Sequence, residues 1–416
     1  MSDKRIYLCL AHMSGKEQQF IQEAFDTNWV VPLGPNVNGF EEDLKQYIGG
    51  ENEVVALSAG TAAVHLALIA CGVGPGDEVL VQSFTFCASS HPIAYLGATP
   101  VFVDSEADTW NMDPKLLEEA IKDRIVKTGK KPKAIVPVYL YGMPAKLDEI
   151  MAISEKYDIP VIEDAAEGFG SKYKGKTCGT FGKYGVLSFN GNKMITTSGG
   201  GALIVPSAEE KKEIMFCATQ AREAYPYYQH EKIGYNYRMS NICAGIGRGQ
   251  MIVAEEHINH HKHVQSLYEE LLKDVKGINL HCQPTTGEYD SNYWLCTVTI
   301  DEDVHIKSQE NAYAEAISGA VGGAAGVTHA GGSIHTDCEP NVNVEALRIF
   351  MDMKGVECRP LWKPMHKQPV YKGCPAYLNG VSEALFKVGF CLPAGPCVTD
   401  EDVKYIVDCI KEAITE

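Results

Sequence analysis

Short runs of consecutive apolar residues recur between residue 53 and about residue 205, and amphipathic stretches separate them. The runs are VVAL (54–57), EVLVQ (78–82), AIVPVYL (134–140), PVIED (160–164), YGVLSF (184–189) and ALIV (202–205). The stretches between them place apolar residues at helical spacing, at 62–72, 114–127 and 147–158. Continuously apolar strands separated by helices predict an α/β fold, in which helices cover both faces of a mostly parallel sheet.

The segments on either side of this region predict two domains. Ser14-Gly15-Lys16-Glu17 has the form of a capping box and predicts the start of a helix, which an extended, Gly/Pro-rich segment at 29–35 follows. Residues 206–270 read as mainly helical, and a smaller α+β unit follows. We expect an N-terminal helix and a large domain over residues 1–265, and a small C-terminal domain over residues 266–416.

One segment of the expected small domain departs from this pattern. Residues 318–341 are rich in Gly, Ala, Ser and Thr and show no apolar periodicity. We interpret the segment as a flexible surface insertion, and a mobile flap near a pocket is the alternative.

Composition and charge narrow the class of protein. The chain has 416 residues, of which 45% are hydrophobic and 22% charged, close to the averages of soluble globular proteins. No apolar run approaches the ~20 residues that span a bilayer, and the N-terminus lacks the form of a signal peptide, so we expect a cytoplasmic protein with no membrane partner. The formal charge of −17 argues against a nucleic-acid partner, but it allows a local basic pocket for one anionic ligand.

The 14 cysteines predict neither a disulfide framework nor a metal site. They are scattered through the chain without a Cys-x-x-Cys pair or a Cys/His cluster at zinc spacing. We expect reduced, mostly buried thiols and no bound metal.

Residues that follow the predicted strands are the first candidates for chemistry, because open parallel sheets bind ligands at the carboxyl ends of their strands. Ser58-Ala59-Gly60-Thr61-Ala62-Ala63 leads directly into a helix. Such a turn suits a phosphate at the helix N-terminus, and it also occurs where packing alone is tight. Phe86 follows the second apolar run, where it is either a stacking ring or a core aromatic.

Two charged residues follow later strands. Asp164 ends an apolar strand, where a carboxylate needs a positive partner: a buried Arg, or the protonated nitrogen of a ring. Lys193 follows another buried strand and precedes a Gly-rich turn. Most lysines are surface charges, but burial here would lower the pKa of the amine and make it nucleophilic. Ser188, five residues earlier, offers a hydroxyl to a phosphate.

Together these features are what a pyridoxal 5'-phosphate site requires: a phosphate turn, a stacking aromatic, a carboxylate for the ring nitrogen and a Schiff-base lysine. Asp164 would keep the pyridine nitrogen protonated. Lys193 would first hold the cofactor and, once a substrate amine displaces it, move a proton between Cα and C4′ as the general base.

The order of these pieces resembles the fold-type I pyridoxal phosphate enzymes, and specifically the sugar aminotransferase family named for DegT, DnrJ, EryC and StrS. The resemblance runs over most of the chain, through NWVVPLGP (28–35), SAGTAAVHLAL, QSFTFCAS, DSEADTWNMDP, PVIEDAAEGFGSKYKGK, SFNGNKMITTSGGGAL and RPLWKPMHKQPVY (359–371). It implies that Lys193 is the Schiff-base lysine, Asp164 the partner of the ring nitrogen and Phe86 the stacking ring. It also implies phosphate contacts from Gly60, Thr61, Ala62 and Ser188.

The resemblance implies a shared active site as well. GYNYRMSN (234–241) is similar to the segment whose Asn, here Asn236, reaches the cofactor phosphate of the neighbouring subunit, so we expect a homodimer. Glu167 stands where the family usually has Gln or His near the ring hydroxyl. Two departures are the Gly199-Gly200-Gly201 turn, where many members carry an acidic residue, and the insertion at 318–341.

Within the family, SFNGNK-x-ITTSGGG and RPLWKPMH resemble 4-aminotransferases that act on UDP-linked 4-keto-6-deoxy-N-acetylhexosamines, as in bacillosamine and exopolysaccharide pathways. An acidic protein that binds a UDP-sugar must gather positive charge locally. The candidate substrate-binding residues are Asn28, Trp29, Arg359, Trp362, Lys363 and His366, each of which has an ordinary surface or interface role as the alternative.

The predicted function is amino transfer from L-glutamate to a UDP-linked 4-keto sugar in two half-reactions, for a surface polysaccharide or glycan. The alternatives are another keto-sugar nucleotide, with the keto group at C3 or with dTDP or GDP, and a non-catalytic sensor that kept the fold. A 3-dehydratase of the same family carries His in place of Lys193, and a cysteine desulfurase would need a catalytic Cys that the 14 cysteines do not single out.

Overall fold

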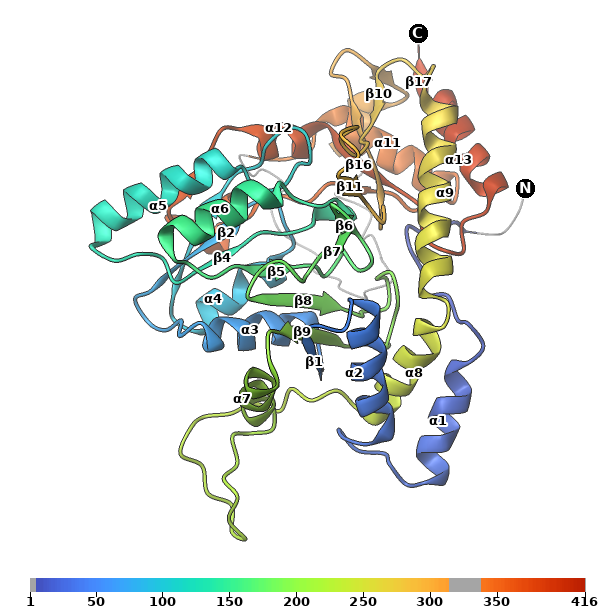
Figure 1. The fold of residues 1–416 in the computed structure, drawn as a ribbon. Coiled ribbons are helices and arrows are strands. Elements are labelled where there is room, and N and C mark those ends of the chain that lie inside the picture. Colours follow the sequence, from blue (N-terminus) through green and yellow to red (C-terminus); the bar gives the residue numbers. More distant parts are fainter. Residues whose placement is uncertain (1–4, 314–337, 416) are drawn as a thin grey trace.

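A computed structural model describes residues 5–313 and 338–415, and its largest element is a sheet built in two halves (Figure 1). One half has the strand order β15-β3-β2-β4, and the other has the order β5-β8-β9-β1. Bridges between Ile135 and Val161 and between Val138 and Asp164 join the halves. The strands are β1 (Glu53–Leu57), β2 (Glu78–Gln82), β3 (Thr99–Val103), β4 (Ala134–Val136), β5 (Ile162–Asp164), β8 (Tyr184–Ser188), β9 (Gly201–Val205) and β15 (Ala376–Tyr377).

Strand β9 pairs antiparallel with both neighbours, whereas the pairs β15–β3, β3–β2, β2–β4 and β5–β8 are parallel. Helices α2 (Pro35–Tyr47), α5 (Pro114–Thr128) and α6 (Leu147–Tyr157) pack into one apolar cluster with the sheet. Helices α3 (Gly60–Ala70), α4 (His91–Tyr95) and α7 (Ala208–Ala218) pack into another. The α/β prediction of a mostly parallel, doubly covered sheet is therefore confirmed.

A third apolar cluster lies beyond the sheet, in the upper right of Figure 1. It contains the antiparallel sheet β10-β12-β16-β14, with strands β10 (Ile278–Leu280), β12 (Cys296–Ile300), β14 (Arg359–Pro360) and β16 (Gly389–Leu392). Helices α9 (Ala254–Leu272), α11 (Val342–Met353) and α13 (Asp400–Ala413) belong to it, and α12 (Val381–Val388) contacts strands β12 and β16 from outside the cluster. Helix α9 runs through residue 265, so the domain division placed there stays a prediction. Residues 318–337 of the predicted insertion lie outside the described residues.

Several local features differ from the sequence expectations. Helix α1 (Glu17–Asp26) begins after Lys16, and the predicted capping box is only half formed: the Glu17 carboxylate accepts the Ser14 amide, but the Ser14 hydroxyl accepts the Lys16 amide. The run 134–140 is a strand only as far as Val136. It ends in a 3₁₀ turn (Leu140–Gly142), in which Tyr141 has a φ of 54°.

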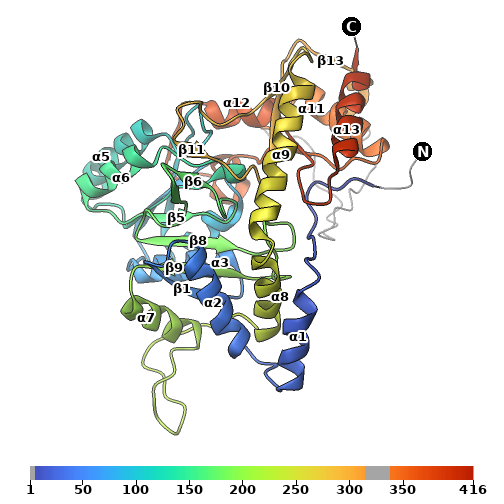
Figure 2. The ribbon, with the colours of Figure 1, turned by 45° about the vertical axis from the view of Figure 1, so that its right-hand side comes forward.

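The region 206–270 is helical in α7, α8 (Asn241–Met251) and α9, but the chain between α7 and α8 is irregular. It extends away from the body of the molecule in two views (Figures 1 and 2). Within the part of the chain that the structure describes, no helix is long and apolar enough to cross a membrane.

Candidate active site

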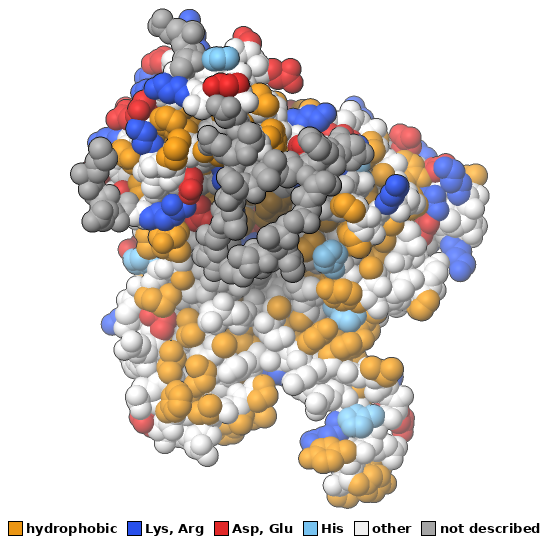
Figure 3. All heavy atoms as spheres, turned by 180° about the vertical axis from the view of Figure 1, so that it is seen from behind, with side chains coloured by type: hydrophobic (Ala, Val, Ile, Leu, Met, Phe, Trp, Pro, Cys, Tyr) orange, Lys and Arg blue, Asp and Glu red, His pale blue; other side chains and the backbone are white. Residues whose placement is uncertain are grey.

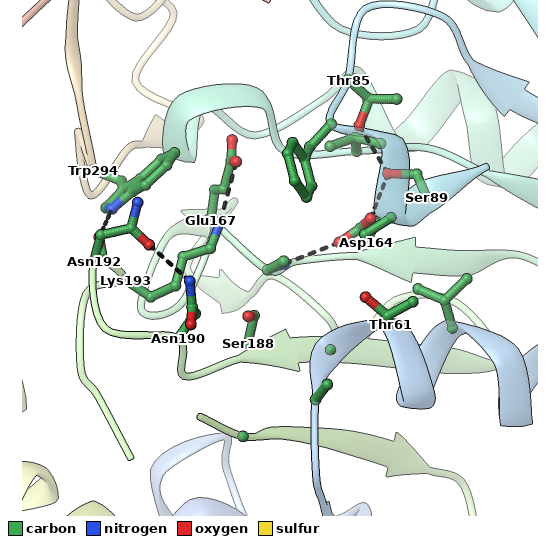
Figure 4. Close-up of a pocket in the computed structure, with 18 of the residues that line it drawn as sticks. Thr61, Thr85, Ser89, Asp164, Glu167, Ser188, Asn190, Asn192, Lys193 and Trp294 are labelled. Atoms are coloured by element: carbon green, nitrogen blue, oxygen red, sulfur yellow. Dashed lines mark hydrogen bonds and ion pairs between the residues drawn. The ribbon is translucent and has the colours of Figure 1, made fainter. Parts of the chain in front are cut away.

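A cavity of about 420 Å³ opens at the carboxyl ends of the central strands (Figure 4). Its walls come from the segments that directly follow β1, β2, β5 and β8, which is the edge where parallel sheets bind ligands. Among the lining residues are Gly60, Thr61, Phe86, Asp164, Glu167, Ser188 and Lys193, together with Trp362 from the RPLWKPMH segment. The structure thus brings these eight predicted residues to one hollow.

The start of α3 forms one end of the cavity. Ala59 is the N-cap residue and makes no side-chain capping bond, so the first amides of the helix have no side-chain acceptor. The helix start lies so close to Ser188 that a Cβ atom on Gly60 would lie 3.0 Å from the Cβ of Ser188. The uncapped amides, the helix dipole and the hydroxyls of Thr61 and Ser188 together suit a phosphate. Ala62 is buried beside this end, and its side chain does not line the cavity.

Asp164 lies at the end of β5, where it is 4% exposed. Its Oδ2 accepts a hydrogen bond from the Ser89 hydroxyl at 2.6 Å, and its Oδ1 accepts the Ala166 amide at 3.2 Å. Thr85 is in turn hydrogen-bonded to Ser89 at 2.8 Å, which fixes that hydroxyl. Burial raises the pKa of Asp164, because the ion loses hydration that two donors only partly replace. A cationic ring nitrogen in the cavity would supply the missing partner.

Lys193 reaches the cavity from the loop after β8. Its Nζ lies 3.2 Å from Oε1 of Glu167 and 4.2 Å from the ring centroid of Trp294. The lysine side chain is 13% exposed. The amine therefore faces the interior of the cavity, where a carbonyl group could reach it.

Glu167 is a second buried carboxyl group in the cavity. Burial raises its pKa to about 7, against the lowering effects of the Lys193 charge and of the Tyr141 amide, which donates to Oε2 at 2.7 Å. The carboxyl group thus changes protonation near neutral pH while it touches the amine of Lys193.

Phe86 lines the cavity with 53% of its surface exposed, and among the described residues its ring neighbour is Trp362, at a centroid distance of 5.4 Å and a tilt of 49°. One face of this ring is consequently available to a planar ligand.

The predicted substrate residues are only partly gathered. Trp362 and Lys363 line a second hollow of about 530 Å³ that shares Thr85 and Phe86 with the first. The His366 side chain is buried, and its ring nitrogens contact Ser83 Oγ at 2.6 Å and Glu383 at 3.0 Å, so it braces the RPLWKPMH segment.

Three further predicted residues lie away from both hollows. Arg359 pairs with Glu357 at 2.8 Å on β14. Asn28 and Trp29 are exposed in the turn after α1, and the Trp29 carbonyl accepts a hydrogen bond from Asn241. None of the three lines the hollows described above.

Asn236 lies on the segment that projects between α7 and α8. It is exposed and forms a bridge with Thr219, and it does not line this chain's cavity. The same segment exposes the large apolar side chains of Tyr225, Tyr227, Tyr228 and Ile233, and Figure 3 shows hydrophobic side chains on the projecting part of the molecule.

Sequence reasoning missed several residues of the site. Ser89 holds Asp164, and Thr85 holds Ser89. Both follow the second strand in SFTFCASS, at the sheet edge where ligands bind, so their position alone could have indicated them. Trp294 carried no signal, because it lies about a hundred residues after Lys193 in a strand-like stretch. Within the described residues, no group of three or more His, Cys, Asp or Glu is arranged to hold a metal ion.

Comparison with known proteins gives this geometry a context. The sequence model of the DegT/DnrJ/EryC1/StrS aminotransferase family matches residues 12–322 and 327–411. EpsN of Bacillus subtilis (strain 168), to which a pyridoxal phosphate-dependent aminotransferase activity is ascribed, is 41% identical over 98% of this chain and 95% of its own. The GDP-perosamine synthase of Escherichia coli O157:H7 is 32% identical over 96% of each chain. The crystal structure of a DegT DnrJ EryC1 StrS aminotransferase from Brucella abortus superposes with a TM-score of 0.81 at 28% identity, over 96% of this chain and 95% of that one.

Proposed function

This chain belongs to the DegT/DnrJ/EryC1/StrS aminotransferase family and is a pyridoxal phosphate-dependent sugar aminotransferase, and we propose that it transfers the amino group of L-glutamate to a UDP-linked 4-keto-6-deoxy-N-acetylhexosamine. The observation that carries the proposal is the meeting of Lys193, Asp164 and the uncapped start of α3 in one cavity. The product would be the 4-amino sugar nucleotide, for a surface polysaccharide or glycan.

The residues of the cavity fit the cofactor at both of its ends. The amides at Gly60 and Thr61 and the Ser188 hydroxyl would hold the phosphate, in a space that a side chain on Gly60 would fill. Asp164, buried and with spare acceptor capacity, would hold a proton on the ring nitrogen, and Phe86 would stack on the ring. Pyridoxal phosphate supplies an electron sink, which allows the Cα–H bond of an amino acid to break.

The chain's own residues then have defined tasks. The Lys193 amine would hold the cofactor between reactions and, when free, would move the proton from Cα to C4′ as the general base. The same amine performs the reverse transfer with the keto sugar. The buried Asp164 carboxylate, held in place by the Ser89 hydroxyl at 2.6 Å, would lie beside the ring nitrogen and stabilise its positive charge.

The sugar and the nucleotide are inferred from this chain's segments. SFNGNK and RPLWKPMH resemble the 4-aminotransferases of UDP-linked sugars, and Trp362 and Lys363 of the second segment line the hollow beside the cofactor cavity. A planar base and a diphosphate match an aromatic side chain and a cation. A GDP-linked sugar is the second candidate, because a GDP-perosamine synthase is 32% identical over nearly the whole chain.

We also propose a homodimer with shared active sites. The segment between α7 and α8 projects from the body and exposes apolar side chains that a partner subunit would cover. Asn236 lies on it, outside this chain's own cavity, where it could serve the cofactor phosphate of the partner.

Isotope transfer tests the proposed reaction. The purified protein with pyridoxal phosphate is incubated with ¹⁵N-labelled L-glutamate and, in separate tubes, with UDP-, dTDP- and GDP-linked 4-keto-6-deoxy sugars and a 3-keto sugar nucleotide. We expect mass spectrometry to find ¹⁵N in the UDP-linked 4-amino sugar, and none with a Lys193→Ala variant. Labelling of the GDP or 3-keto product alone would overturn the substrate assignment, and no labelling from glutamate would overturn the donor.

A further inference from the structure

The side chain of Lys193 contacts two groups that have no part in the proposed bond between the lysine and the cofactor. Its ammonium lies 3.2 Å from Glu167 Oε1 and 4.2 Å from the centroid of the Trp294 ring (Figure 4). Glu167 is 3% exposed at the side chain and Trp294 is buried. A carboxylate and an aromatic face are the two kinds of surface that attract an ammonium ion away from water.

One buried amide fixes both groups. The Nδ2 atom of Asn292 donates to the Glu167 carbonyl at 2.7 Å, and its Oδ1 accepts the Trp294 amide at 2.8 Å. The Trp294 indole N–H donates to the carbonyl of Asn192, the residue before the lysine, at 2.6 Å. The second oxygen of Glu167 accepts the Tyr141 amide. Glu167 and Trp294 are thus held in position independently of where the Lys193 side chain lies.

We propose that Glu167 and Trp294 form a holding site for the free Lys193 ammonium, which the lysine occupies whenever its nitrogen is not bonded to the cofactor. The proposal rests on the proposed role of Lys193 and adds a resting place to it. In the half of the cycle in which the amino group sits on the cofactor, the lysine is a free amine. The holding site keeps that nitrogen inside the cavity, and the ammonium must give up its proton before the amine can act as the base of the reverse transfer. Glu167 and Trp294 are therefore positioning residues that act through Lys193.

The other titratable groups that face this pair are Asp164, Tyr141, Cys391 and Cys9. Burial raises the pKa of Cys9 to about 12 and the pKa values of Tyr141 and Cys391 well above their ordinary values, so all three are neutral between pH 6 and 9. In this range, the carboxyl group that contacts the Lys193 amine is that of Glu167, which ionises as the pH rises through about 7.

The holding site has a measurable consequence for the cofactor-free protein. Lys193 must lose a proton before it attacks the cofactor aldehyde, and a nearby carboxylate holds that proton. Loss of the Glu167 charge removes the acceptor that lies 3.2 Å from the amine, so the pH midpoint for cofactor capture should fall by about one unit or more. Loss of the Trp294 face should lower the midpoint less, by about a two- to fivefold change in proton concentration.

The test follows the visible absorption band that develops when pyridoxal 5'-phosphate is added to cofactor-free protein, from pH 6 to pH 9.5. The variants are Glu167→Gln, which keeps the shape without the charge, and Trp294→Leu. The matched controls are Glu106→Gln, a buried carboxylate 2.9 Å from the Lys146 amine outside the cavity, and Trp110→Leu, a buried indole stacked on His281. The cofactor's own titrations are common to all proteins and cancel in the comparison of midpoints.

We expect lower midpoints for Glu167→Gln and Trp294→Leu, and wild-type midpoints for both controls. Equal midpoints in all five proteins, within about 0.2 units, would overturn the holding site. A wild type that forms no band, or a Lys193→Ala variant that keeps it, would instead overturn the proposed role of Lys193. If a variant binds the cofactor too weakly, the pH dependence of Lys193 acetylation by acetic anhydride, read by peptide mass spectrometry, gives the same midpoint and decides in the same way.

Discussion

The stability of the cofactor-free protein should depend on pH through Glu167. Its carboxyl group is fully enclosed, and burial raises its pKa to about 7 from an ordinary value of 4.5. The folded state therefore binds the proton of Glu167 more tightly than the unfolded chain does. The sign follows from linkage: this group's contribution to stability is fully present below about pH 4.5 and is lost as pH rises through about 7.

The size of the effect follows from the same two values. A difference of about 2.5 units, at 1.36 kcal/mol per unit, is worth about 3 kcal/mol over the whole range. Most of it, about 2–3 kcal/mol, should be lost between pH 5 and pH 8. In a Glu167→Gln variant this loss is absent, because the amide does not ionise, while its oxygen can still accept the Tyr141 amide that now donates to Glu167.

Urea unfolding of both cofactor-free proteins, at a fixed protein concentration and at half-unit steps from pH 5 to pH 8, measures the effect. The difference in unfolding free energy between variant and wild type isolates Glu167, because all other titrating groups are common to both. We expect this difference to grow in favour of the variant by about 2–3 kcal/mol as pH rises. A difference in unfolding free energy that stays constant within about 0.5 kcal/mol would refute a pKa of about 7 for the buried Glu167 carboxyl group.

Three further predictions concern the cavity and the subunit contact. Asp164→Asn should still fold, because Ser89 and the Ala166 amide remain, but should lower the rate of the glutamate half-reaction about 10²–10⁴-fold in a stopped-flow assay; a loss under threefold would contradict its role. Gly60→Ala should weaken cofactor binding at least about tenfold by equilibrium dialysis, because the new Cβ would lie 3.0 Å from the Cβ of Ser188; unchanged affinity would exclude a phosphate at this turn. Asn236→Ala should be impaired alone and should regain about a quarter of wild-type activity when subunits are exchanged with a Lys193→Ala variant, since hybrid dimers contain one intact site; no recovery would argue against shared sites.

The sequence predicts the layout of the sheet because its signal is local. Runs such as VVAL and YGVLSF are buried on both faces, so they are apolar throughout, and the residues that follow them are brought to one edge by the parallel order of the strands. The same reasoning locates Asp164 and Lys193. It does not locate α2, because the Pro/Gly signals at 32–35 mark the end of one element without indicating that another helix begins.

The surroundings of the site depend on contacts between distant segments. Arg359 pairs with Glu357 and His366 contacts Glu383, and no spacing rule predicts that these carboxylates, rather than a substrate, are their partners. Trp294 meets Lys193 only because the chain returns to the cavity about a hundred residues later. Such contacts are set by tertiary packing, which periodicity and motif spacing do not reveal.

The most direct test of the account is the visible absorption spectrum of the purified protein loaded with pyridoxal 5'-phosphate. We predict a band that a Lys193→Ala variant lacks, that L-glutamate bleaches, and that a UDP-linked 4-keto-6-deoxy-N-acetylhexosamine restores in the glutamate-treated protein. A band that L-glutamate leaves unchanged, or that no nucleotide-linked keto sugar restores after bleaching, would contradict it.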